Sequence, residues 1–163
     1  MPIRDILLPE FDHEMASTRK ILERVPEEDL HFQPHPKSMP LGRLAGHITE
    51  LSGWVTPVMQ REKLELDASY KPYIPASQKE LLERFDKNVG ESRAALSGVS
   101  DEQLAVAWTL KFGGQTIFTL PRVAAYRGMI MSHLIHHRGQ LGVYLRVLEV
   151  EIPGMYGPSA DDK

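Results

Sequence analysis

Four long stretches of the chain carry apolar residues at steps of three and four, which is the spacing of one face of an α-helix. They predict amphipathic helices from about Ile3 to Val25, Pro40 to Leu66, Ser77 to Gly98 and Pro121 to Val150. The clearest stripe lies in the first helix and consists of Leu7, Phe11, Met15, Thr18, Leu22 and Val25. Pro26 should end this helix, because proline disfavours the helical conformation in the residue before it.

The segment from Ala107 to Thr119 departs from the helical period. Its two halves are rich in β-branched and aromatic residues and flank Gly113 and Gly114, which predicts a short β-hairpin. Two strands alone are marginally stable in water, so we expect the hairpin to lean on the helices. The fold class is therefore predicted as all-α: one four-helix-bundle domain over residues 1–163, with the hairpin inserted before the last helix.

Composition narrows the functional classes. The chain has 163 residues and a net charge of −3, which gives no electrostatic reason to expect nucleic acid or an anionic membrane surface as a partner. No apolar run approaches the roughly 20 residues that span a bilayer. The first residues lack the apolar core of a signal peptide, so we expect a cytoplasmic protein. The chain contains no cysteine, so a metal site must use His, Asp, Glu and water, and any thiol must come from a substrate.

Two histidines four residues apart, His133 and His137, stand out inside the last predicted helix. This spacing puts both imidazoles on one helical face, roughly 5–6 Å apart at Cβ, where they can bind one divalent metal. The same face carries apolar or aromatic residues before and after the pair, namely Tyr126, Ile130, Leu141, Tyr144 and Leu148. Because such a stripe is normally buried, the histidines should point into the protein, where each needs a polar partner.

A third histidine, His47, lies on the apolar face of the second predicted helix. A single histidine on such a face is usually a core residue that bonds to a neighbour. With His133 and His137 in the same chain, His47 becomes the candidate third metal ligand. Small residues lie near it in the sequence (Gly42, Ala45, Gly46 and Gly53), and we expect them to let the helix of the histidine pair approach closely.

Other polar residues are weaker candidates for a place in the metal site. Three histidines outside the apolar stripes are predicted to be surface residues, namely His13, His31 and His35. His136 and Arg138 are next to His137 but off the ligand face, so they are expected beside the site or on the surface. Gln140 follows His137 by three residues and is expected either to hydrogen-bond near the site or to support a helix contact. No Asp or Glu stands out as a general base, and the catalytic residues remain unassigned.

The chain resembles the DinB-like proteins, also called YfiT-like metal-dependent enzymes. Three segments carry the resemblance: the run from Pro34 to His47, the motif His133-Leu-Ile-His-His137-Arg-Gly-Gln140, and the ending from Ile152 to Ser159. The resemblance implies a four-helix bundle with a three-histidine metal site, whose ligands would be His47, His133 and His137. Members of the family with known activity look like transferases or isomerases that use low-molecular-weight thiols such as bacillithiol, mycothiol or glutathione.

Three neutral imidazoles leave at least one coordination position free, which is typical of a catalytic metal site. Zinc, nickel, iron(II) and manganese all accept imidazole, so the ligands do not choose the metal. The leading hypothesis is a transferase in which the metal activates a small thiol for attack on an electrophile. It predicts basic residues near the pocket mouth, with Arg43, Arg127 and Arg138 as candidates. One alternative is a metal-dependent hydrolase. The other is a non-enzymatic bundle that binds metal or a small molecule in stress responses, with a homodimer as one form it could take.

Overall fold

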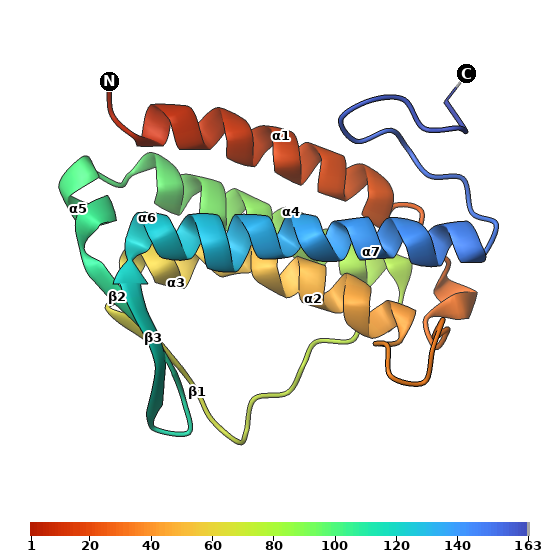
Figure 1. Cartoon of the computed structure of the whole chain (residues 1–163), viewed down its shortest axis with the longest axis horizontal. Helices are drawn as coiled ribbons and strands as arrows, with labels where there is room; N and C mark the ends of the chain where they lie inside the picture. The colour runs from red at the N-terminus through yellow and green to blue at the C-terminus, as the bar shows by residue number, and fades with distance from the viewer. Residues whose placement is uncertain (163) are drawn as a thin grey trace.

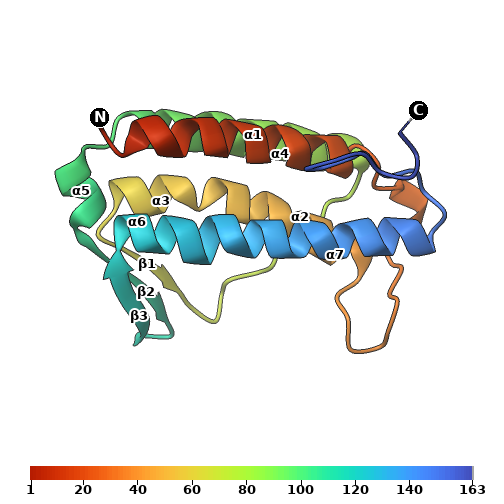
Figure 2. The same cartoon turned by 45° about the horizontal axis from the view of Figure 1, so that its top comes forward.

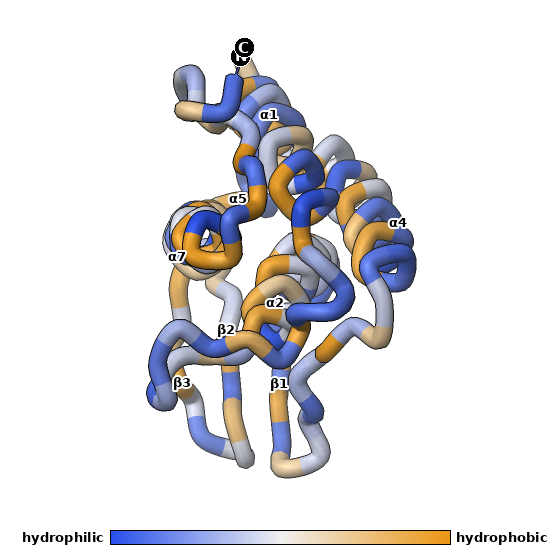
Figure 3. The backbone as a smooth tube through the Cα atoms, turned by 90° about the vertical axis from the view of Figure 1, so that its right-hand side faces the viewer, coloured by the Kyte–Doolittle hydropathy of each residue, from blue (hydrophilic) through white to orange (hydrophobic). Residues whose placement is uncertain are grey.

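The computed structural model describes residues 1–162 and is mainly helical, with a small three-stranded sheet at one end (Figure 1). The long helical segments are α1 (Arg4–Leu22), α2 (Leu41–Gly53), α4 (Gln78–Ser97) and α7 (His133–Val147). Each of α1 and α2 packs against both α4 and α7. Figure 2 shows these helices nearly parallel in two layers, and the end-on view in Figure 3 places α2 between α7 and α4.

The first and third predicted helices are confirmed. All six apolar-stripe residues of the first helical prediction are buried, although α1 itself ends at Leu22. The helix α4 begins after Ser77, whose side chain accepts a hydrogen bond from the Glu80 backbone N–H at 3.1 Å. This contact satisfies one of the unpaired N–H groups of the first helical turn.

The second predicted helix is interrupted at Trp54, and the prediction is wrong beyond Gln60. The chain turns at Trp54 into the short helix α3 (Val55–Gln60), and then forms the strand β1 (Lys63–Leu66). Pro57 gives a physical reason for the break, because it has no N–H group to donate to the Gly53 carbonyl one turn earlier. In β1 charged and apolar residues alternate, which is the period of a strand rather than of a helix.

The predicted hairpin is confirmed as β2 (Ala107–Phe112) and β3 (Gln115–Pro121), with both turn glycines at positive φ. The strand β1 pairs with β2 in parallel, so the all-α prediction misses one strand and the sheet it completes. Trp108 anchors the sheet to the helices. Its side chain is fully buried, and its indole N–H donates to the Pro57 carbonyl at 3.2 Å. The hairpin therefore packs against α3, which stabilises strands that would be marginally stable alone.

The last predicted helix is a continuous rod of three parts that ends at Val147. A first turn, α6 (Arg122–Ala124), leads into eight residues of π-helix, η2 (Ala125–Ser132), and then into α7. The π-helical segment ends directly before His133, and such segments often occur beside functional sites. Three shorter features complete the chain: a 3-10 turn at Glu27–Asp29, the helix α5 (Asp101–Ala105), which was not predicted, and an irregular C-terminal segment.

The hydrophobic core runs between the long helices and includes the fully buried Phe11, Leu44, Leu51, Tyr126 and Leu141. The buried stripe on both sides of the histidine pair is therefore confirmed at Tyr126 and Leu141. Within residues 1–162, no helix has the length and apolar character that crossing a membrane requires.

Candidate metal centre

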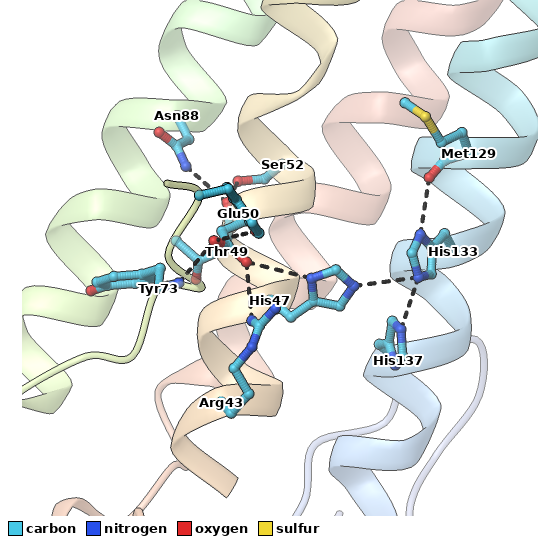
Figure 4. A network of polar contacts seen from close by, with 11 residues as sticks. Arg43, His47, Thr49, Glu50, Ser52, Tyr73, Asn88, Met129, His133 and His137 are labelled. Atoms are coloured by element: carbon cyan, nitrogen blue, oxygen red, sulfur yellow. Dashed lines mark hydrogen bonds and ion pairs between the residues drawn. The ribbon is translucent and has the colours of Figure 1, made fainter. Parts of the chain in front are cut away.

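The three predicted ligands meet between α2 and α7 (Figure 4). Atoms that could bind a metal, one from each of His47, His133 and His137, all lie within 4.8 Å of one another. Nε2 of His133 is 3.3 Å from Nε2 of His47 and 2.9 Å from Nε2 of His137. Residues 86 positions apart in the sequence thus present the same ring nitrogen to one point.

The glycines near His47 do not have the role that the sequence suggested. A Cβ atom at Gly42 would meet Leu30, one at Gly46 would overlap the Tyr73 carbonyl, and one at Gly53 would meet Asn88. None of these neighbours belongs to α7, so the expectation that the glycines make room for that helix was wrong. The small residues instead let the connections before and after α2, and the helix α4, lie close to it.

The Nδ1 atom of each imidazole faces an oxygen atom that can accept a hydrogen bond. His133 Nδ1 lies 3.2 Å from the Met129 carbonyl oxygen, and His137 Nδ1 lies 2.7 Å from Gln140 Oε1. His47 Nδ1 makes a longer contact of 3.5 Å with Glu50 Oε2. An oxygen acceptor requires a proton on the nitrogen that faces it, so these contacts favour the Nδ1–H tautomer of all three rings.

The consequence is that the three Nε2 atoms carry lone pairs where they converge. Two bare nitrogen atoms 2.9 Å apart cannot hydrogen-bond to each other and repel. A shared cation resolves this conflict, and neutral imidazole nitrogen is a good ligand for divalent zinc, nickel and iron. Because the Nδ1 partners hold each ring in the required tautomer, the residues present fit a metal ion.

The protonation states also fit metal binding. Burial lowers the pKa of His137 to about 4, and the neighbouring histidines add to this effect, whereas the hydrogen bond that His137 donates to Gln140 opposes it. Burial also lowers the pKa of His133, with His47 as the next cause. Both rings are therefore neutral at pH 7, so a metal does not have to displace their protons.

Glu50 is the residue that the sequence analysis missed. Its side chain is 8% exposed and faces His47 from the next turn of α2. It also accepts hydrogen bonds from Arg43, the Tyr70 hydroxyl and the Tyr73 backbone N–H. Burial alone would raise the pKa of Glu50, but the hydrogen bonds from His47, Tyr73 and Tyr70 and the charge of Arg43 outweigh it, so the pKa is lowered. Glu50 is therefore ionised near neutral pH.

The remaining candidates divide between the site and the rest of the molecule. Gln140 does bond near the site, at His137. His136 is exposed, as are His13, His31 and His35. Arg43 forms an ion pair with Glu50 and therefore lies beside the site, whereas Arg127 forms an ion pair with Glu10. Arg138 is buried and paired with Glu14 on α1, so its expected place beside the site or on the surface was wrong.

Comparison with known proteins places the chain in a family. The model of the DinB superfamily matches residues 10–141, and the chain belongs to this superfamily. It is 26% identical over 166 residues to the uncharacterised protein YrdA of Bacillus subtilis strain 168, covering 97% of this chain and 90% of YrdA.

Two crystal structures of DinB-like proteins share the fold. That of a protein from Bacillus cereus ATCC 10987 is 29% identical, with a TM-score of 0.73 and coverage of 95% of this chain and 98% of the other. That of YjoA from Bacillus subtilis is 20% identical, with a TM-score of 0.69 and coverage of 91% and 95%. The resemblance inferred from the histidine motifs is therefore confirmed, and the three-histidine cluster is compatible with a metal-binding protein.

Proposed function

We propose that this protein is a metal-dependent transferase that binds one divalent metal through His47, His133 and His137 and activates a low-molecular-weight thiol for transfer to an electrophile. The observation that supports the metal site is the convergence of the three Nε2 atoms, with an oxygen atom facing the Nδ1 atom of each ring. The helices α1, α2, α4 and α7 would act as a four-helix bundle that holds these side chains in place.

When bound, the metal would act as a Lewis acid that lowers the pKa of a coordinated thiol. The contribution of the chain is to hold three neutral donors at one point and to leave further coordination positions to the substrate. The chain has no cysteine, so no thiol of its own competes for these positions. Arg43 is the basic residue next to the site, where it also holds Glu50.

The hydrolase alternative has less support from the geometry. It needs a carboxylate that is free to take a proton from water. Glu50 is the carboxylate that contacts the histidine cluster, but four donors already occupy it: Arg43, His47, Tyr70 and the Tyr73 backbone N–H. A carboxylate held in this way orients its neighbours and is poorly placed to act as a base. The thiol transferase is therefore the better proposal.

The test is a conjugation assay on untagged protein loaded separately with zinc, nickel or iron(II). Each form is incubated with bacillithiol, mycothiol or glutathione and the electrophile monochlorobimane, and the fluorescent conjugate is followed. We expect at least one combination to exceed the uncatalysed rate, and His137→Ala to abolish the excess. His136→Ala, which alters the adjacent exposed histidine, should leave it intact. Conjugation at the uncatalysed rate for every metal and thiol, in protein shown to hold metal, would rule out this activity.

A further inference from the structure

The connection between β1 and α4, residues 67–77, passes beside α2 and is fixed to it at Glu50 (Figure 1). We call this segment the strap. Two of its groups reach the same carboxylate oxygen: the Tyr70 hydroxyl and the Tyr73 backbone N–H each lie 2.9 Å from Glu50 Oε1. Both donate, because a carboxylate can only accept.

Tyr73 is held in place by further contacts. Its side chain is buried, and the Arg84 guanidinium lies 3.9 Å from the centre of its ring. On the other side its backbone lies against Gly46, where any Cβ atom would overlap the Tyr73 carbonyl. The strap therefore rests directly on the turn of α2 that carries His47, and only glycine at position 46 permits this approach.

The two oxygens of Glu50 face different parts of the molecule. Oε1 accepts from the strap, whereas Oε2 accepts from Arg43 at 3.0 Å and faces His47 Nδ1 at 3.5 Å. Figure 4 shows this path from Tyr73 through Glu50 to the imidazole. Because the strap and Arg43 together fix the plane of the carboxylate, they also fix the oxygen that orients His47.

The other two histidines do not depend on a distant segment. His133 and His137 find their Nδ1 acceptors within four residues on their own helical rod, at Met129 and Gln140. The acceptor of His47 is also local, but it is held by groups that lie 20 and 23 residues further along the chain. His47 is thus the ligand whose orientation is coupled to another part of the fold.

We propose that Glu50 is a positioning residue and that the strap sets the metal affinity of the three-histidine site by holding Glu50 against His47. This inference rests on the proposed metal site. The coupling is reciprocal, so a metal that fixes His47 also stabilises the strap. Hydrogen exchange of the Tyr73 amide, which donates to Glu50, should therefore slow when metal binds.

The first arm of the test uses Glu50→Gln in metal-free protein. Glutamine keeps the shape and one acceptor oxygen, but its NH₂ group replaces the oxygen that faces Arg43 and His47. Long-range proton–nitrogen NMR reads the tautomer of each imidazole directly. We expect His47 to be the Nδ1–H tautomer in the wild type and to shift towards Nε2–H in Glu50→Gln, with His133 and His137 unchanged.

The second arm measures the zinc dissociation constant by competition with a chromophoric chelator. Glu50→Gln should weaken zinc binding about 10- to 100-fold, the usual cost of losing the hydrogen-bond partner of a ligand histidine. Tyr70→Phe removes one of the hydrogen bonds to Glu50 and should weaken binding about threefold. The matched control is Glu14→Gln, because Glu14 is an equally buried glutamate, 6% exposed, that pairs with Arg138 away from the histidines.

The outcomes separate the two proposals. Failure of the wild type to bind any of zinc, nickel and iron(II) would overturn the proposed function, while the NMR arm would still test Glu50 in the metal-free protein. An unchanged His47 tautomer in Glu50→Gln, or zinc affinity equal to that of the wild type in both Glu50→Gln and Tyr70→Phe, would overturn the positioning role. If Glu50→Gln does not fold, the positioning role is tested with Tyr70→Phe alone, by measuring both the His47 tautomer and the zinc affinity of that variant.

Discussion

Two buried glutamates of this protein have nearly the same surroundings. Glu14 on α1 is 6% exposed and pairs with Arg138 at 2.6 Å, and Glu50 on α2 is 8% exposed and pairs with Arg43 at 3.0 Å. Each also accepts a hydrogen bond from a tyrosine hydroxyl that lies in an irregular segment, Tyr156 for Glu14 and Tyr70 for Glu50. Both carboxylates tie a distant part of the chain to a helix.

The two glutamates differ in the residues to which their hydrogen-bond networks extend. Arg138 also donates to the Thr18 hydroxyl and to the Glu14 carbonyl on α1, so the Glu14 network closes on itself between α1, α7 and the C-terminal segment. The Glu50 network continues to His47. Burial and ion pairing therefore do not distinguish these two carboxylates, whereas contact with a candidate metal ligand does. Variants of the two networks should separate stability from metal affinity.

The largest effect is expected from Glu14→Ala, which leaves Arg138 buried without its counter-charge. The free energy of unfolding should fall by ~3–5 kcal/mol. Urea denaturation of the metal-free protein measures this loss. The zinc dissociation constant of the folded variant should stay within about twofold of the wild type, since His47, His133 and His137 have their hydrogen-bond partners outside this network. A loss of stability below ~1 kcal/mol would show that the ion pair is not the main tie between α1 and α7.

The second-largest effect is expected from acid, because the histidine cluster beside Glu50 includes the buried His137. The pKa of His137 is about 4 in the folded metal-free protein and near 6.5 in an unfolded chain. Between these values the unfolded state binds a proton that the folded state does not. The free energy of unfolding should therefore fall as the pH drops through this window, by up to ~1.4 kcal/mol per pH unit, and this contribution should level off below about pH 4.

Urea denaturation with chelator present at pH 7, 6 and 5 measures this slope. Other groups also titrate in this range, so the informative quantity is the difference between variants. His137→Gln should have a shallower slope than the wild type, and the exposed His136→Gln should match the wild type. Equal slopes for all three proteins would contradict a neutral, buried His137.

A smaller effect is expected from Gly46→Ala, which adds a methyl group where the Tyr73 backbone rests on α2. Displacing the strap should cost ~1–3 kcal/mol of unfolding free energy and weaken zinc binding as well. Gly90→Ala is the control, because a Cβ atom on that part of α4 meets nothing within 4 Å and should stabilise the helix by roughly 0.5–1 kcal/mol. Loss of stability in Gly46→Ala with unchanged zinc affinity would show that the strap does not influence metal binding.

The smallest effect is expected from the two tyrosine variants. Tyr156→Phe removes the hydroxyl that donates to Glu14, and Tyr70→Phe removes the one that donates to Glu50. Each should lower the free energy of unfolding by about 1 kcal/mol. Only Tyr70→Phe should weaken zinc binding. Similar zinc affinities in the two variants would show that the Glu50 network has no more influence on metal binding than the Glu14 network.

The sequence predicts the parts of this molecule that depend on local periodicity. The stripe of α1, the hairpin around its two glycines and the histidine pair all follow from spacing along one element, and the structure confirms them. The strand β1 could have been found, because Leu64 and Leu66 alternate with charged residues. Glu50 could also have been found, since it follows His47 by three residues on a helix.

Other features depend on contacts that no spacing in the sequence specifies. Tyr70 and Tyr73 reach Glu50 only because the strap returns across α2. The partnership of Arg138 with Glu14 joins the last helix to the first, 124 positions apart. Sequence spacing instead placed Arg138 near the histidines, because its neighbour His137 is there. The π-helical turns before His133 likewise have no pattern that distinguishes them from an α-helix.

The most direct test of the metal centre is the metal content of untagged protein by plasma mass spectrometry, with the wild type compared with His47→Ala and His137→Ala. A tag rich in histidine would add binding sites of its own, so it is left out. We predict about one divalent metal per wild-type chain and its loss in both variants, because each removes one of three converging donors. A wild type that holds no metal after reconstitution with zinc, nickel and iron(II) would contradict the metal centre and leave three clustered histidines without a catalytic role.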